Sequence, residues 1–362
     1  MKRKISIIST LLITFTLLLT GCSNNKADTI ETVNKDKDKD ETYLKLENYM
    51  KKYSNFNGTV LVAKNEKILF ENGYGMANAE NKIQNTPKTV FRIASITKQF
   101  TATAILMLQE KGLLNVQDTI DKYIENYPNG NKIKIYNLLN HTSGIPEYIK
   151  FISSDSYTPE KLVELFKDKK LNFTPGTKYE YSNSNYVLLG YIIEKVSGMS
   201  YENYMEENIF KPLKLESTGT LNNMDRATEK AEGYAYINHK SNQYQKDINM
   251  DPSLAYAAGN LYSNAEDLLV WNNNLCSGKL INDNSLKEML TPYQNGYGFG
   301  WFIINKDNQK LIEHEGDILG FTSLIRRDMN TGYVVILLSN KRGEGTNLKE
   351  MCDGLFATVS NK

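Results

Sequence analysis

Strand-like and helix-like segments are unevenly distributed along this chain, and their distribution constrains the fold more than any single motif does. Runs rich in β-branched and aromatic residues lie near both ends, at residues 58–65, 67–75, Phe299–Ile304, Lys310–His314, Phe321–Arg326 and Tyr333–Leu338. From about residue 118 to residue 255, helical spacing of apolar residues dominates instead. We therefore predict an α+β fold: an antiparallel sheet built from both chain ends, flanked by helices, with an inserted all-helical lobe. A cleft between such lobes is a favoured place for a ligand site.

A buried helix is expected at Ala94–Leu114, directly after the segment Phe91–Ile93. Its apolar residues recur at helical spacing, and Ile105 with Leu106 makes a second side apolar too. Gly112 supplies the stop signal. Further helices are expected at Tyr136–Leu139, Pro159–Phe166, Tyr186–Val196, Tyr201–Phe210, Asn264–Leu275 and Thr346–Val359.

The first 22 residues carry the signals of an exported lipoprotein. A basic segment, Met1–Lys4, precedes an apolar run, Ile5–Leu19, that is too short for a comfortable membrane span. The run ends in Leu-Thr-Gly-Cys, which resembles a bacterial lipobox. We therefore expect residues 1–21 to be a lipoprotein signal peptide and Cys22 to be lipidated on the extracytoplasmic side of the cell membrane. An ordinary signal peptide is the alternative, but the expected A-x-A-like cleavage site is missing.

Residues 22–42 are predicted to be a tether that begins at the lipidated cysteine. The stretch is rich in Lys, Asp, Asn and Glu and has almost no side chains that could bury surface, so we expect disorder. As a flexible coil it would hold the folded part on the order of 25 Å from the bilayer. Residues 43–362 then form the folded domain, which contains the helical lobe.

The overall charge and the cysteine content exclude several classes of function. With 43 basic and 42 acidic residues, the formal charge of +1 provides no field that would hold nucleic acid. Three cysteines are too few for a disulfide framework, and no Cys/His spacing suits zinc. We expect no metal and no organic cofactor, and Cys276 and Cys352 remain as thiols.

Ser95 and Lys98 form an S-x-x-K pattern at the start of the buried helix. Three-residue spacing sets the hydroxyl and the amine on the same helix face. In an apolar setting the pKa of Lys98 should fall, so that its amine can help to move the proton of Ser95. The helix terminus also supplies backbone N–H groups that suit an oxyanion. The alternative is an N-cap serine followed by a solvated lysine, because this pattern is common by chance.

Two further segments carry groups of the same chemistry. Tyr181 lies in a loop, and beside a lysine ammonium its phenolate is favoured and can act as a base. Asn183 can donate its amide to a substrate carbonyl or cap the helix that follows. In the later β run, Gly316 of His314-Glu315-Gly316 would let a substrate backbone approach the strand edge, and the amide of Asp317 would be a second oxyanion donor.

Taken in this order, the three patterns resemble the serine penicillin-binding and class C β-lactamase-like hydrolases, a family that includes D-alanyl-D-alanine carboxypeptidases, esterases and D-aminopeptidases. The supporting matches are Phe91–Ser95, Leu138–Pro146, Tyr181–Asn183, Ala258–Ser263, Tyr297–Trp301 and the His314–Gly316 strand. The S-x-x-K logic is the one known from β-lactamases.

The resemblance implies a role for each matching residue. Ser95 is the nucleophile that becomes acylated, and Lys98 and Tyr181 share the proton transfers. Asn183 orients the substrate amide, and the amides of Ser95 and Asp317 form the oxyanion hole. His314 corresponds to a position that is Lys in most β-lactamases and His in several carboxypeptidases and esterases. His141 is expected to be structural and to pack beneath the site, and His239 is expected at the surface.

Glu315 is the residue that bears on the choice of substrate. The family usually has Thr or Gly there, which helps to hold a substrate carboxylate, whereas two acids, Glu315 and Asp317, would disfavour an anionic ligand. Alternatively, strand alternation turns Glu315 off the substrate face, or Arg326 or Arg327 neutralises it. An acidic subsite suits a D-alanyl ester of teichoic acid or a D-amino-terminal peptide of peptidoglycan. A class C-like β-lactamase or carboxypeptidase that binds β-lactams and a catalytically silent envelope-binding protein are the alternatives.

Overall fold

The computed structural model describes residues 41–153, 156–238, 243–247, 251–306, 308–342 and 347–360. The predicted signal peptide, Cys22, His239 and almost all of the predicted tether lie outside these described residues. A helix spans residues 41–50, so residues 41 and 42, which the sequence assigns to the tether, are already helical. Within the described ranges, no helix is both long enough and apolar enough to cross a membrane.

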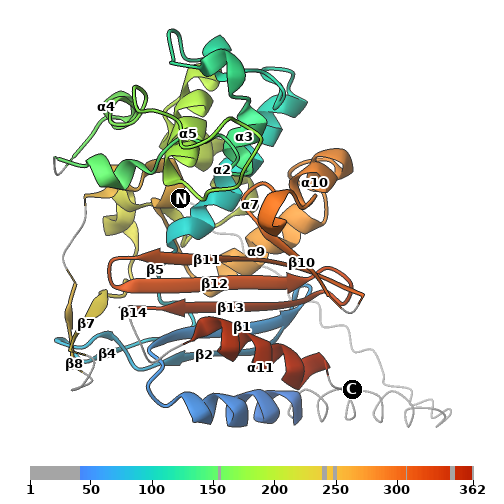
Figure 1. The fold of residues 1–362 in the computed structure, drawn as a ribbon. Coiled ribbons are helices and arrows are strands. Elements are labelled where there is room, and N and C mark those ends of the chain that lie inside the picture. Colours follow the sequence, from blue (N-terminus) through green and yellow to red (C-terminus); the bar gives the residue numbers. More distant parts are fainter. Residues whose placement is uncertain are drawn as a thin grey trace, which may run out of the picture. The chain divides into compact units, whose positions relative to one another are not determined.

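A six-stranded sheet within residues 42–362 joins the two ends of the chain (Figure 1). In spatial order its strands are β10 (Phe302–Lys306), β11 (Gln309–Ile318), β12 (Phe321–Asp328), β13 (Tyr333–Ser339), β1 (Gly58–Lys64) and β2 (Lys67–Tyr74). Every neighbouring pair is antiparallel, and the pairing of β1 with β13 sets Gly58 opposite Ser339. The predicted antiparallel sheet from both chain ends is confirmed.

Both faces of this sheet are covered, because alternate residues of a strand point to opposite sides. In β13, Val335 and Leu337 pack with Leu46 of the helix over residues 41–50 and with Leu355 of α11 (Leu348–Ser360). Between them, Ile336 joins the main core on the opposite face, towards the remaining helices. Figure 1 shows the first helix and α11 on one side of the sheet and α2 (Thr97–Glu110) and α9 (Ala265–Cys276) on the other.

The helices follow the predicted positions to within a few residues. A 3₁₀ turn, η2 (Ala94–Ile96), leads into the buried helix α2 (Thr97–Glu110), and Gly112 then adopts a left-handed φ of 68°. Asn264 caps α9 as predicted, since its Oδ1 accepts from the amide of Asp267 at 2.8 Å. The other helices are α3 (Ile135–Leu139), α4 (Pro159–Glu164), α5 (Asn183–Ser197), α6 (Tyr201–Met205), the π-helical turn η6 (Glu206–Phe210), α7 (Lys211–Leu213), α8 (Tyr256–Gly259), α9 (Ala265–Cys276) and α10 (Asp283–Met289). Shorter 3₁₀ turns are η1 (Lys51–Tyr53), η3 (Ile120–Lys122), η4 (Gly130–Lys132), η5 (Tyr148–Phe151), η7 (Leu221–Arg226), η8 (Pro252–Leu254) and η9 (Gln294–Gly296).

The expectation of an all-helical lobe between residues 118 and 255 is wrong, because three strands lie within it. β6 (Gly219–Thr220) pairs with β9 (Leu261–Ser263), which also pairs with β5 (Phe91–Arg92). β7 (Tyr234–Asn238) pairs with β8 (Gln243–Lys246) and with β14 (Lys341–Arg342), and outside the lobe β3 (Met76–Asn78) pairs with β4 (Ile83–Gln84). β6 and β14 have two residues each, too few to show a period of two, and both pair with strands far away in the chain.

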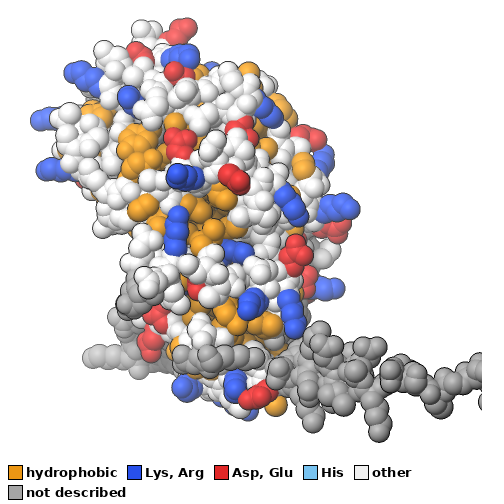
Figure 2. Space-filling view, turned by 90° about the vertical axis from the view of Figure 1, so that its right-hand side faces the viewer, with side chains coloured by type: hydrophobic (Ala, Val, Ile, Leu, Met, Phe, Trp, Pro, Cys, Tyr) orange, Lys and Arg blue, Asp and Glu red, His pale blue; other side chains and the backbone are white. Residues whose placement is uncertain are grey.

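Charges of both signs are mixed over the face that Figure 2 presents, with hydrophobic side chains between them. The mixture agrees with the near balance of 43 basic and 42 acidic residues. This face therefore does not offer a surface of a single charge.

Candidate active site

Ser95 lies in the middle of the η2 turn, at the point where the chain enters α2. The preceding residue, Ala94, has a φ of 49°, a left-handed conformation that is uncommon for a residue with a side chain. Two contacts from the sheet hold this segment: Ser323 Oγ donates to Ile93 O at 2.9 Å, and β11 passes close by at Gly316. The edge of the sheet thus fixes the turn that presents the Ser95 hydroxyl.

Gly316 has a packing role that the sequence did not predict. A Cβ at this position would lie 2.3 Å from Ile93 O and 2.3 Å from Ser323 Oγ. The protein's own segment before Ser95 therefore already requires a glycine here.

The Lys98 amine meets Ser95 and two further acceptors. Lys98 Nζ donates to Ser95 Oγ at 3.0 Å, to Asn183 Oδ1 at 2.8 Å and to Ala258 O at 2.8 Å. The side chain is fully buried, and burial lowers the pKa of Lys98 to about 7, although the charge of Glu147 opposes this shift. Near neutral pH a substantial fraction of Lys98 is an uncharged amine beside the hydroxyl.

Tyr181 lies next to the same amine, with its ring centroid 4.9 Å from Lys98 Nζ. Burial raises the pKa of Tyr181 well above its usual value, and a side-chain hydrogen bond with Ser95 opposes this only in part. The expectation of a phenolate is wrong: burial has the largest effect on the pKa of Tyr181, and the protonated phenol is favoured. The arrangement suits Tyr181 as a hydrogen-bonding partner of Ser95, and the lowered pKa of Lys98 suits its amine to accept the Ser95 proton.

Asn183 is the first residue of α5 and not a loop residue, and both ends of its amide are engaged. Its Oδ1 accepts from Lys98, while its Nδ2 donates to Glu147 Oε2 at 3.0 Å. The predicted contact of this amide with a substrate carbonyl therefore has to use the one remaining N–H. Glu147 was not among the residues predicted from the sequence, although it directly follows the motif that ends at Pro146.

His314 and His141 are buried behind the catalytic groups. His314 Nε2 lies 3.0 Å from the Tyr297 hydroxyl and His314 Nδ1 lies 2.6 Å from the carbonyl of Glu315. Burial, with a contribution from the charge of Lys98, lowers the pKa of His314 to about 3, so the ring is neutral and supplies no cation for a substrate. His141 packs against Tyr181 with ring centroids 4.3 Å apart.

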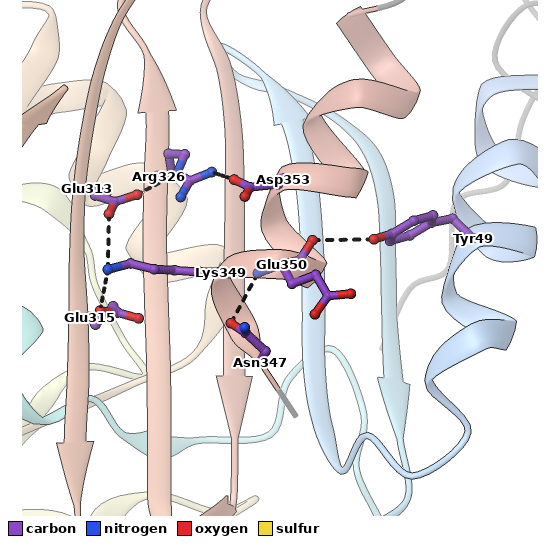
Figure 3. Close-up of polar contacts among 8 residues, drawn as sticks. All are labelled: Tyr49, Glu313, Glu315, Arg326, Asn347, Lys349, Glu350 and Asp353. Atoms are coloured by element: carbon purple, nitrogen blue, oxygen red, sulfur yellow. Dashed lines mark hydrogen bonds and ion pairs between the residues drawn. The ribbon is translucent and has the colours of Figure 1, made fainter. Parts of the chain in front are cut away.

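Glu315 points away from the site, so the argument for an acidic subsite formed by its side chain is wrong. Strand alternation turns it to the face covered by α11, where its carboxylate lies 2.9 Å from Lys349 Nζ (Figure 3). Arg326 does not neutralise Glu315: it pairs with Glu313 at 2.5 Å and with Asp353. Arg327, the other candidate, donates to Asn65, Asn272 and Asn273.

A pocket of about 150 Å³ opens beside the serine. Three of the predicted site residues line it: Ser95, Asn183 and Asp317, whose carboxylate pairs with Arg342 at 2.7 Å. The rest of the wall is largely apolar and comes from Tyr148, Ile149, Ile152, Leu254, Ala255, Ala258 and Ile318. No lysine or arginine of the described chain lines the pocket, and the described residues contain no cluster of three or more His, Cys, Asp or Glu side chains that could hold a metal ion.

Comparison with known proteins shows which family has a similar sequence. Residues 45–353 match the family model described as Beta-lactamase. The putative penicillin-binding protein PbpX of Bacillus subtilis is 34% identical over 298 residues, which cover 82% of this chain and 73% of that protein. Penicillin-binding protein 4* of the same organism is 32% identical over 309 residues, covering 79% of this chain and 68% of the relative.

Solved structures with the same fold include one named a D-stereospecific amidohydrolase and one named a D-amino acid amidase. A D-stereospecific amidohydrolase from Streptomyces sp. superimposes with a TM-score of 0.74 at 26% identity, covering 87% of this chain and 98% of that one. The D-amino acid amidase from Ochrobactrum anthropi SV3, complexed with L-phenylalanine, gives a TM-score of 0.77 at 25% identity, covering 89% and 99%.

Proposed function

Because the chain belongs to the β-lactamase family of serine hydrolases, we propose that it cleaves D-alanyl ester or peptide linkages of the cell envelope through an acyl-enzyme while tethered to the membrane. The observation that carries the proposal is the contact of 3.0 Å between Ser95 Oγ and the Lys98 amine, whose pKa is lowered to about 7, beside a small apolar pocket.

The chemistry follows from these positions. Uncharged Lys98 accepts the proton of Ser95 while Oγ attacks the substrate carbonyl carbon, and the backbone amides of Ser95 and Asp317 hold the oxyanion. Collapse of this intermediate breaks the ester or amide bond, and the leaving alcohol or amine takes the proton from Lys98. A water molecule then gives a proton to Lys98 and attacks the acyl carbon. Collapse of this second intermediate breaks the bond to Ser95 Oγ, which takes the proton back from Lys98, and D-alanine leaves.

Two features support a substrate that has a D-alanyl acyl group and no carboxylate near the bond that is cleaved. The apolar wall around Ile149 and Ile318 suits a methyl side chain, and a D-stereospecific amidohydrolase and a D-amino acid amidase share the fold. The described lining offers no cation, and His314 is neutral, so a carboxylate such as that of penicillins would lack a charged partner. The ester of teichoic acid fits this lining better than a C-terminal D-alanine of a stem peptide.

The direct test is release of D-alanine from D-alanylated teichoic acid. We expect release by the wild type and none above background by Ser95→Ala. Equal release by the two proteins would contradict the proposal. A fluorophosphonate adduct at Ser95, read by intact mass, separates an enzyme from a silent binding protein, which would give no adduct.

The family match and the names of the relatives make β-lactam turnover the second candidate. Nitrocefin hydrolysis that is faster than D-alanine release, and that disappears in Lys98→Ala, would favour that reading.

The tether is tested separately from the chemistry. The lipobox that ends at Cys22 supports lipidation, and we expect Cys22→Ser to move the protein from the membrane fraction to the soluble extracytoplasmic fraction. Unchanged membrane association of this variant would refute the lipid anchor.

A further inference from the structure

Glu147 contacts Asn183, the residue that hydrogen-bonds the Lys98 amine, and lies outside the motifs quoted from the sequence. Its Oε2 accepts two hydrogen bonds from Asn183: from the backbone N at 2.8 Å and from the side-chain Nδ2 at 3.0 Å. The carboxylate is half-buried, directly before the 3₁₀ turn η5 that forms one wall of the pocket.

These two bonds determine which way the Asn183 amide faces. A carboxylate can only accept, so the amide must turn its NH₂ group to Glu147 and its oxygen to Lys98. The opposite orientation would bring Asn183 Oδ1 against the carboxylate and leave Lys98 facing a donor. Glu147 therefore ensures that Lys98 meets an acceptor at 2.8 Å.

That acceptor decides where the lone pair of Lys98 points. An uncharged amine has two N–H groups and one lone pair, and Lys98 faces three partners. Asn183 Oδ1 and Ala258 O can only accept, so they take the two N–H groups. The lone pair is then left for Ser95, which is the one partner with a proton to give.

We propose that Glu147 is a positioning residue, which acts through Asn183 to direct the lone pair of uncharged Lys98 at the Ser95 hydroxyl. The inference rests on the proposed role of Lys98 as base. It adds a side chain outside the recognised motifs to the group formed by Ser95, Lys98 and Asn183.

Charge gives this role a distinctive signature. Glu147 favours the protonated form of Lys98, against the larger effect of burial, and so raises the pKa of Lys98 above the value that burial alone would set. Other ionisable or polar groups face Lys98 from each neighbouring element: Ser95 on η2, Tyr181 before α5, Asn183 and Tyr186 on α5, His141 after α3 and His314 on β11. Burial lowers the pKa of both histidines, and a neutral or protonated imidazole cannot replace the negative charge of Glu147.

A purely structural role would look different. Glu147 also binds the first backbone N–H of α5, where a carboxylate stabilises the helix dipole. Loss of that contact alone lowers the melting temperature but leaves the pH dependence of the reaction unchanged.

The experiment measures the rate of Ser95 phosphonylation by a fluorophosphonate between pH 5 and pH 9 in the wild type and in Glu147→Gln. We expect the plateau rate of the variant to fall about tenfold or more, because the base is misdirected. We also expect the midpoint of the acid limb to move below that of the wild type by about half a pH unit or more. A plateau and midpoint equal to those of the wild type would overturn the inference.

Glu180→Gln is the matched control. Glu180 Oε1 also accepts from an asparagine side chain, Asn172 Nδ2, at 2.6 Å, but the residue is exposed. The plateau rate and the midpoint of the acid limb in Glu180→Gln should equal those of the wild type. A change of either quantity as large as in Glu147→Gln would show that any nearby carboxylate has the same effect.

Glu147→Asp covers the case in which Glu147→Gln does not fold. It keeps the charge but is one methylene shorter, so it cannot keep both bonds to Asn183. We expect a reduced plateau with the midpoint near that of the wild type, and an unreduced plateau would refute the positioning role. Phosphonylation does not depend on the natural substrate: absence of D-alanine release with normal phosphonylation refutes only the proposed substrate.

Discussion

At the scale of single residues, the amine of Lys98 is fully buried, whereas in water its pKa would be 10.5. Because burial lowers this pKa to about 7, the base form is lost on acidification. We expect kcat/KM for a D-alanyl ester to rise between pH 6 and pH 8 and then to level off. Lys98→Ala should reduce the plateau by a factor of about 100 to 10,000 and remove the acid limb. A wild-type profile that stays flat down to pH 4 would contradict this assignment.

A second prediction at this scale concerns Glu315, whose carboxylate faces α11 and pairs with Lys349. Glu315→Gln should leave kcat/KM within about twofold of the wild type, because the charge is separated from the pocket by the sheet. Steady-state kinetics with neutral and anionic acyl donors gives the answer. A selective gain with the anionic donor would revive the acidic subsite.

The sequence predicted those parts of the site that depend on local spacing. Ser95 and Lys98 meet because one helical turn separates them, and the lowered pKa of Lys98 follows from a helix that is apolar on more than one side. The sequence could not show that desolvation controls Tyr181, nor that Glu147 reaches Asn183 across 36 positions of the chain. Both facts depend on tertiary packing, which leaves no local pattern.

At the scale of elements, the close approach of β11 to the segment before Ser95 makes Gly316 sensitive to substitution. In Gly316→Ala the new methyl group would collide with Ile93 O, which is backbone and cannot turn aside. We expect a loss of kcat/KM of about tenfold or more, since small shifts of catalytic groups are costly. Wild-type kinetics for Gly316→Ala would contradict the proposed contact.

The attachment of α11 to the sheet gives another prediction. Glu313 and Arg326 are almost fully buried and lie 2.5 Å apart, and Arg326 also reaches Asp353 on α11 (Figure 3). Arg326→Met leaves Glu313 without its buried partner, so we expect the free energy of unfolding to fall by about 3–5 kcal/mol. Lys349→Ala removes a half-exposed partner of the same network and should cost about 1 kcal/mol or less. Urea unfolding of the two variants checks the ranking, and equal losses would refute it.

Element prediction succeeded where the repeating pattern was long and failed where it was short. The runs that form β1 and β13 hold seven residues each, enough to show their character. β6 has only two residues, and its partner β9 lies more than 40 positions later in the chain. β6 forms because its backbone groups hydrogen-bond with those of β9. Two side chains alone cannot show that such a partner is present.

At the scale of the whole molecule, the two buried histidines predict sensitivity to acid. In the folded state the pKa of His314 is about 3 and that of His141 is also lowered, whereas in the unfolded chain each returns to its usual value of 6.5. Below that value the unfolded state binds more protons, so stability falls as the pH drops from 6.5 towards 3. The slope is up to about 1.4 kcal/mol per pH unit for each histidine.

Urea unfolding at pH 7.0 and 5.5 measures this loss. His314→Gln removes one of the two titrating groups, so its stability should depend less steeply on pH than that of the wild type. Identical slopes for both proteins would contradict a neutral, buried His314.

The sheet was predictable as a whole because its strands lie at both ends of the sequence, but this topology also sets the order of assembly. β1 lies between β2 and β13, and its partner positions in β13 are more than 260 residues away along the chain. A nascent chain that has not yet reached Tyr333 has only a hairpin to offer at its start, and an isolated hairpin is barely stable in water. Closure of the central layer therefore waits until Tyr333–Ser339 has been synthesised, which keeps the polypeptide open for any machinery that must handle it before it folds.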